Sequence, residues 1–111
     1  PMRIQAQTPK FEVRFTDDAV NELQSIHAYV RDNGGQKAAD NLVEQVKTKI
    51  DLLKQTPFIG VAPIKFPFLM GLGYRLLPCG KYWIIYFVFP ELNIVEIHHI
   101  VHQRRDLNAL I

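Results

Sequence analysis

The sequence predicts an α+β fold of order β-α-α-β-β-β, in which a helical hairpin packs on one face of a twisted antiparallel sheet. Two observations predict it. Apolar residues recur at spacings of three and four between Val20 and Leu53, as they do in helices. Residues 74–101 then hold three strand-like runs separated by short turns. A short alternating run before the helices supplies the first strand.

The length of 111 residues leaves room for one domain, because a second core would need roughly 50 residues of its own. A hydrophobic content of 48% with 22% charged residues is typical of a soluble globular protein. We therefore expect a single domain over residues 11–111. Residues 1–10 show no convincing periodicity and form an N-terminal extension. Pro1 is not a native initiator, which indicates processing or added residues.

Cysteine usage and hydropathy indicate where the protein resides. Cys79 is the only cysteine, so no intramolecular disulfide can form. The chain has no signal-peptide pattern and no apolar run of about 18 residues that would cross a membrane. These observations predict a cytoplasmic protein with no membrane association.

The first strand is predicted at residues 11–15, where apolar and polar residues alternate. Thr16, Asp17 and Asp18 are candidates for the N-cap of a first helix. Its apolar stripe consists of Val20, Leu23, Ile26 and Val30. The stripe ends at Asn33-Gly34-Gly35, so we predict an amphipathic surface helix of about four turns.

A second helix is predicted from Gln36 to the residue before Thr56, because Pro57 disfavours helical backbone in the residue that precedes it. Its apolar face consists of Ala39, Leu42, Val43, Val46, Ile50 and Leu53. About three residues join the two helices, and so short a link predicts an antiparallel helical hairpin.

The second half of the chain is predicted to form a loop and a meander. Residues 56–73 hold three prolines and three glycines, which predicts a loop that packs down through its apolar residues. Strands at residues 74–78, 81–89 and 94–101 should form an antiparallel meander. The middle run is apolar at every position from Tyr82 onward, as expected of a central strand covered on both faces.

Acidic residues are missing between Asp51 and Glu91, although the formal net charge is only +2. The basic residues of that stretch are Lys54, Lys65, Arg75 and Lys81, and the C-terminal tail adds Arg104 and Arg105. A region whose charged side chains are all positive favours an anionic partner, either nucleic acid or an acidic protein segment. A solvated basic face without a partner would show the same pattern.

Several short motifs, in this order and spacing, resemble the ParE/RelE superfamily of bacterial toxins across nearly all of residues 11–110. They are Leu23-x-x-Ile26-x-x-Tyr29, Ala38-Ala39, Leu53-x-x-x-Pro57-x-x-Gly60, Gly73-Tyr74-Arg75, Tyr82-x-Ile84-Ile85-Tyr86 and Val101-His102-Gln103-Arg104-Arg105-Asp106-Leu107. Each motif is weak alone, and together they are fairly specific. The arginine before the meander and the closing His-x-Arg-Arg-Asp look more like the ParE and plasmid-stabilisation branch.

This resemblance implies the toxin half of a type II toxin–antitoxin pair, which blocks growth unless a cognate antitoxin wraps it in a hetero-oligomer. ParE-like members poison DNA gyrase, whereas RelE-like members cut mRNA in the ribosomal A site. The ParE-like features imply gyrase as the target, with ribosome-dependent mRNA cleavage as the alternative. Retention of the fold without toxicity is a third hypothesis.

An mRNA-cleaving enzyme would need a base for the 2′-hydroxyl, an acid for the leaving oxygen and cations over the phosphate. The residues available are Arg75 and Arg104 as phosphate clamps, His102 as acid or base, and Lys65 nearby. Family members that use a glutamate base carry it after the second helix, and residues 52–90 contain no carboxylate. The residues therefore favour a toxin that acts by binding.

Three histidines fall in or directly after the last predicted strand, at positions 98, 99 and 102. Strand alternation predicts His99 on the core face with Ile97 and Val101, where a hydrogen-bond partner would satisfy its ring. His98 and His102 would share the other, polar face, and four residues of strand would separate them by about 13 Å, too far for joint metal ligation. We therefore predict no metal site, and we expect no cofactor.

The antitoxin implied by the resemblance would insert an amphipathic helix or an extended segment into grooves along the helical hairpin and the sheet. Candidates for that contact are Ile26, Tyr29 and Val30, with core packing as the alternative. Candidates for contact with the target or the antitoxin are Arg75, His98, His102, Arg104 and Arg105. Arg75 has a structural alternative, in which it pairs across strands with Glu96 or Asp106.

Overall fold

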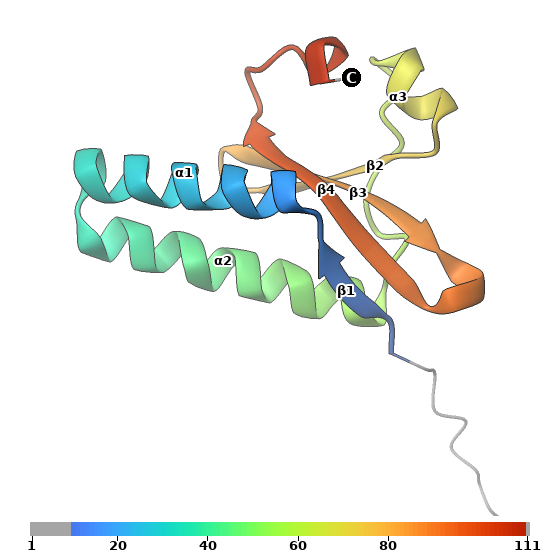
Figure 1. The fold of residues 1–111 in the computed structure, drawn as a ribbon, viewed down its shortest axis with the longest axis horizontal. Coiled ribbons are helices and arrows are strands. Elements are labelled where there is room, and N and C mark those ends of the chain that lie inside the picture. The colour runs from blue at the N-terminus through green and yellow to red at the C-terminus, as the bar shows by residue number, and fades with distance from the viewer. Residues whose placement is uncertain (1–9, 111) are drawn as a thin grey trace, which may run out of the picture.

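A computed structural model describes residues 10–110, and it shows two long helices beside a four-stranded sheet (Figure 1). The elements are β1 (Glu12–Phe15), α1 (Asp17–Gly34), α2 (Gln36–Gln55), α3 (Pro67–Gly71), β2 (Arg75–Cys79), β3 (Tyr82–Phe89), η1 (Pro90–Leu92), β4 (Ile94–His102) and η2 (Leu107–Leu110). This order confirms the predicted α+β class. Apart from Lys10, the predicted extension lies outside the described residues. Within them, no helix is long and apolar enough to span a membrane.

The two long helices form the predicted antiparallel hairpin and lie together on one face of the sheet (Figure 1). α1 begins where the sequence predicts, because the Thr16 hydroxyl accepts a hydrogen bond of 3.2 Å from the Ala19 N–H. The link is a single residue, Gly35, whose φ of 89° is one that glycine adopts without strain. Its N–H still donates to the carbonyl oxygen of Arg31 as in a helix, and its positive φ turns the chain out of α1.

The strands lie in the order β1-β4-β3-β2. Strands β2, β3 and β4 form the predicted antiparallel meander, but β1 pairs with β4 in parallel. The sheet is therefore mixed, and the prediction of a wholly antiparallel sheet was wrong at β1. Parallel neighbours need a long crossover connection, which the two helices and strands β2 and β3 supply here.

Apolar side chains form two cores, one on each face of the sheet. The first core, under the hairpin, includes Ala19, Leu42, Val46, Leu53, Ile84, Tyr86, Val95, Ile97 and Ile100. The second core consists of Leu69, Leu76, Ile85, Val101 and Leu107. Three consecutive residues of β3, at positions 84–86, are 0% exposed and alternate between the two cores. This confirms that β3 is a central strand covered on both faces.

The loop predicted for residues 56–73 contains a short helix, α3. The prolines and glycines of this stretch had favoured a loop without regular structure. Pro67 occupies the first turn of α3, where proline fits because an N–H there has no partner within the helix. Leu69 is 1% exposed and packs in the second core with Leu107. The prediction was thus correct about packing and wrong about regular structure.

A β-bulge interrupts β4 at its histidines. Ile85 of β3 pairs with His99, while the next residue of β3, Tyr86, pairs with Ile97. His98 is therefore the extra residue of the bulge. Beyond this point the alternation of side chains between the two faces shifts by one position.

The bulge overturns two predictions about the faces of β4. Ile97 belongs to the first core and Val101 to the second, so these two do not share a face as predicted. His99 pairs with Ile85 of the second core and therefore lies on the same face as Val101, so that part of the prediction is correct. His98 alternates with Ile97 and faces away from the hairpin, whereas His102 lines a groove beside the hairpin. The prediction that His98 and His102 share one polar face was therefore wrong.

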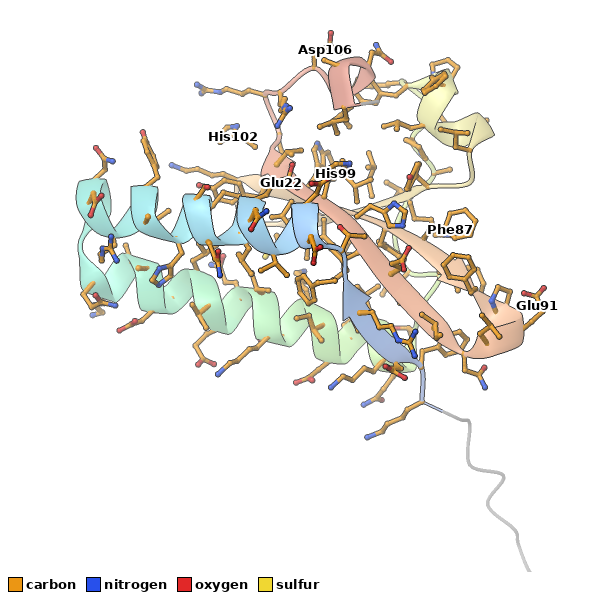
Figure 2. The ribbon with its side chains drawn as sticks, in the orientation of Figure 1. Glu22, Phe87, Glu91, His99, His102 and Asp106 are labelled. Carbon is orange, nitrogen blue, oxygen red and sulfur yellow. The ribbon has the colours of Figure 1, made fainter. Side chains whose placement is uncertain are left out.

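Helix α1 covers the part of β4 that β1 leaves open. β1 pairs only with residues 94–97 of β4. Beyond them, the Glu22 carboxylate accepts a hydrogen bond of 3.1 Å from the Ile100 N–H and lies 3.2 Å from Nδ1 of His99 (Figure 2). The predicted hydrogen-bond partner of His99 therefore exists, and it is Glu22.

We expect Glu22→Ala to lower the free energy of unfolding by about 2 kcal/mol, because the buried Ile100 N–H would lose its acceptor. Glu22→Gln is the matched control, since its amide oxygen still accepts that N–H, and it should cost less than about half as much. Urea denaturation followed by the fluorescence of Trp83 measures both. Equal losses would show that the charge of Glu22 matters and its role as an acceptor does not.

Candidate functional site

A groove of about 870 Å³ opens between the hairpin and one end of the sheet. Its helical side includes Ile26, Tyr29, Val30 and Leu42, and its strand side includes Lys81, Tyr82 and His102. Figure 2 shows His102 at the end of β4 that reaches over α1. The groove therefore joins segments that are far apart in the sequence.

The helical side of the groove carries an apolar strip beside polar residues such as Asn41 and Gln45. Ile26, Tyr29 and Val30, the residues predicted to contact a partner, all line it. Tyr29 is 65% exposed, whereas Ile26 and Val30 are half-buried and also pack against the first core. Spacings of three and four place the three side chains on one face of α1. The result is an apolar strip that is fixed by core packing on one side and open on the other.

His102 and Lys81 stand at the polar end of the groove. The His102 ring meets the Tyr82 ring edge-on, with 5.5 Å between centroids. Its Nδ1 accepts a hydrogen bond of 3.0 Å from the Arg104 N–H, so the neutral ring carries its proton on Nε2. Burial, and to a lesser extent Tyr29, raises the pKa of Tyr82, which keeps that phenol protonated. This end therefore offers donors, namely the His102 Nε2–H and the Lys81 ammonium.

Gln103 ties the C-terminal tail to the turn between β2 and β3. Its amide nitrogen donates to the carbonyl oxygens of Gly80 at 3.2 Å and Tyr82 at 3.1 Å. The next two residues, Arg104 and Arg105, are exposed. The tail therefore adds positive charge close to the polar end of the groove.

Arg75 lies at the start of β2, away from the groove. Its Nη1 donates to the carbonyl oxygens of Phe58 at 3.1 Å and Gly60 at 2.8 Å, and its guanidinium lies 5.0 Å from the centre of the Phe58 ring. The structural alternative predicted for Arg75, an ion pair with Glu96 or Asp106, was therefore wrong in its partners. The guanidinium instead holds the segment that follows α2.

The residues considered for RNA cleavage do not come together. Arg75 and His102 pair with residues of β3 that are four positions apart, which corresponds to about 13 Å. Lys65 is exposed in the segment between α2 and α3. His102 and Arg104 are in contact through the hydrogen bond described above. No single phosphate could therefore touch both arginines and the histidine in this arrangement.

On the opposite face of the sheet, His98 is held from both sides. Its Nε2 lies 2.6 Å from Oε1 of Glu96, and its Nδ1 lies 2.9 Å from the hydroxyl of Tyr74. Burial, and secondarily the charge of Glu96, raises the pKa of Tyr74, so its hydroxyl stays protonated. It donates to Nδ1 in the tautomer whose proton lies on Nε2, toward Glu96. His98 therefore ties β4 to the chain entering β2. The contact between Glu96 and His98 could have been predicted from the sequence, because residues two apart in a strand lie on the same face. The contact between Tyr74 and His98 could not, because only the fold brings these two residues together.

Two groove residues, Lys81 and Tyr82, were not singled out from the sequence as a site. The sequence predicts an exposed turn at Gly80 and Lys81, but only the fold places this turn beside the helical hairpin. Across residues 10–110, no three histidine, cysteine or acidic side chains gather closely enough to hold a metal ion.

Comparisons with known proteins point to one family. A family model described as the ParE toxin of type II toxin–antitoxin system, parDE, matches residues 13–107. A solved structure described as the chromosomal ParDE TA system from P. aeruginosa has a similar fold, with a TM-score of 0.66 and 18% identity, over 86% of this chain and 98% of that chain. Curated proteins gave no match. Because the family model covers most of the sequence, the chain belongs to the ParE toxin family of type II toxin–antitoxin systems.

Proposed function

We propose that the chain is a growth-inhibiting toxin that poisons DNA gyrase in the cytoplasm and is neutralised when a cognate antitoxin fills the groove beside the hairpin. The observation that carries the antitoxin contact is the groove itself, with its apolar strip and its donors at one end. Membership of the ParE toxin family supports the toxin–antitoxin context. The expected resting form is a toxin–antitoxin hetero-oligomer, and plasmid stabilisation is a role that such a pair would serve.

An amphipathic helix of the antitoxin suits this groove. Its apolar stripe would pack on Ile26, Tyr29 and Val30, as helices do when they bind in apolar grooves. A carboxylate near one end of that helix would meet the Lys81 ammonium and the His102 Nε2–H. Such charge-assisted hydrogen bonds fix the direction and register of a bound helix.

Gyrase is favoured over the ribosome and mRNA as the target, because RNA cleavage needs an acid, a base and cations around one phosphate. Arg75 and His102 are held far apart along the sheet, and residues 52–90 contain no carboxylate. These observations support action by binding. Any role of His102 is then assigned to the groove and not to catalysis.

The experiment that tests this proposal is a gyrase supercoiling assay run beside an mRNA cleavage assay on programmed ribosomes, with antitoxin-free protein at matched concentrations. We expect inhibited supercoiling with trapped cleaved DNA and intact mRNA. Unchanged supercoiling together with cut message would overturn the gyrase proposal and favour the RelE type of activity.

We expect Tyr29→Ala to weaken antitoxin binding by at least about tenfold, because this side chain would be a central aromatic contact in the groove. Its exposure of 65% means that the free energy of unfolding should change by less than about 0.5 kcal/mol. Leu92→Ala is the matched control, since Leu92 is 64% exposed in the turn between β3 and β4. Titration calorimetry compares the two, and equal affinities would place the antitoxin elsewhere.

A further inference from the structure

The segment between α2 and β2 exposes an unusual amount of apolar surface. Seven side chains from this stretch are 45% to 72% exposed, namely Phe58, Ile59, Val61, Ile64, Phe68, Met70 and Leu72. They account for seven of the ten large hydrophobic residues that are exposed among residues 10–110. We call them the 58–72 surface. Apolar exposure concentrated in this way is typical of a site that binds another molecule.

The backbone beneath these side chains is fixed at several points. Val61 and Leu76 exchange two backbone hydrogen bonds of 2.8 and 2.9 Å at the edge of the sheet. The Gly60 N–H donates to the buried hydroxyl of Tyr86 at 2.8 Å. Farther along, Leu69 is anchored in the second core. The apolar side chains are therefore displayed on an ordered support, and a partner would not have to order the segment on binding.

The 58–72 surface is separate from the groove proposed for the antitoxin. No residue of this segment lines the groove. In Figure 1 the segment and α3 lie on the β2 side of the molecule, away from the turn that joins α1 to α2. A helix bound in the groove would therefore leave the 58–72 surface free for a second partner.

The charges around this surface select the chemistry of that partner. Residues 52–90 hold no carboxylate, and Lys65 is exposed in the middle of the segment. The guanidinium of Arg75 lies against Phe58 at its start. A partner with apolar side chains flanked by carboxylates matches this pattern. Nucleic acid matches it poorly, because interfaces with nucleic acid are far more polar and cationic than seven apolar side chains around one exposed lysine.

We propose that the 58–72 surface is where the toxin docks on its protein target, through a target surface that presents apolar side chains and carboxylates. This inference rests on the proposed function, in which the target is DNA gyrase. It divides the molecule into an antitoxin face, which is the groove, and a target face at the β2 edge of the sheet. Inhibition of the target then needs residues that the antitoxin groove does not contain.

The test is the double variant Ile64→Ser with Phe68→Ser. Both side chains are more than half exposed, so the fold should be retained, and a thermal melt confirms it. We expect the concentration that inhibits gyrase supercoiling to rise by at least about tenfold, while affinity for the antitoxin changes less than about twofold. Lys65→Glu should also raise the inhibitory concentration, and this increase should be larger at low salt than at high salt, because salt screens the interaction between surface charges. Leu92→Ser is the matched control and should behave as the wild type.

The possible outcomes separate this inference from the proposed function. Inhibition by the wild type and equal inhibition by the double variant would overturn the target face and leave the proposed function standing. No inhibition by the wild type would overturn both. Lost antitoxin binding with intact inhibition would assign the 58–72 surface to the antitoxin. A wild-type dimer that the double variant converts to a monomer, again with intact inhibition, would assign it to a second copy of the chain.

Discussion

Replacing Gly60 by alanine is expected to lower the free energy of unfolding by about 3 kcal/mol. An added Cβ would lie 2.5 Å from the Tyr86 hydroxyl oxygen, 2.7 Å from its Cε1 and 2.9 Å from the carbonyl oxygen of Leu76. None of these atoms can move away cheaply, because Tyr86 is 0% exposed and Leu76 pairs with Val61 in the sheet. Urea denaturation monitored by the fluorescence of Trp83 measures the loss.

A double-mutant cycle with Tyr86→Phe tests the cause of this effect. Tyr86→Phe alone should cost about 1 to 2 kcal/mol, because it leaves the buried Gly60 N–H without its acceptor. It also removes the atom that the new Cβ would approach most closely. The double variant should therefore be more stable than the sum of the two losses predicts, by roughly 1 kcal/mol. Additive losses of stability would mean that the clash with the Tyr86 hydroxyl is not the cause of the destabilisation by Gly60→Ala.

The same contact matters for function, because Gly60 lies at the start of the 58–72 surface. Its hydrogen bond with Tyr86 and the contacts of Arg75 fix the backbone from which Phe58 and its neighbours project. A glycine is required here by the close approach of core atoms. The glycine that closes the Leu53-x-x-x-Pro57-x-x-Gly60 motif thus stands at a structural junction.

Local patterns in the sequence were enough to predict most of the elements. The Thr16 cap and the glycines after Asn33 set the limits of α1, and Pro57 set the end of α2, each through backbone chemistry that acts over a few residues. The three strands of the meander followed from their apolar runs and turns. These features depend on neighbours in sequence, and the structure confirms them.

Features that depend on distant parts of the chain were predicted less well. The parallel pairing of β1 with β4 joins residues more than 80 positions apart, and no local pattern encodes it. The bulge at His98 is one extra residue in an otherwise regular run, and it moves His102 to the other face of the sheet. The groove, the site that matters most for the proposal, exists only because the Lys81 turn lies against the hairpin.

Removal of the C-terminal tail is an obvious test of whether Arg104 and Arg105 touch the target, yet we expect it to unfold the protein. Leu107 is 0% exposed and packs in the second core, on the face away from the hairpin. Leu107→Ala alone should cost about 3 kcal/mol through the lost burial and the cavity that remains. A domain of this size has only about 5 to 15 kcal/mol of stability in total, so truncation from position 104 would remove a large share of it.

Arg104→Ala combined with Arg105→Ala separates the charge of the tail from its packing. Both side chains are exposed, so the free energy of unfolding should change by less than about 0.5 kcal/mol, in contrast to Leu107→Ala. Urea denaturation of the three proteins tests this difference directly. Wild-type stability of Leu107→Ala would contradict the packing assigned to the tail. If the stable double variant still inhibits supercoiling while the truncated protein does not, the loss on truncation reflects unfolding, and the target face lies elsewhere than in the basic tail.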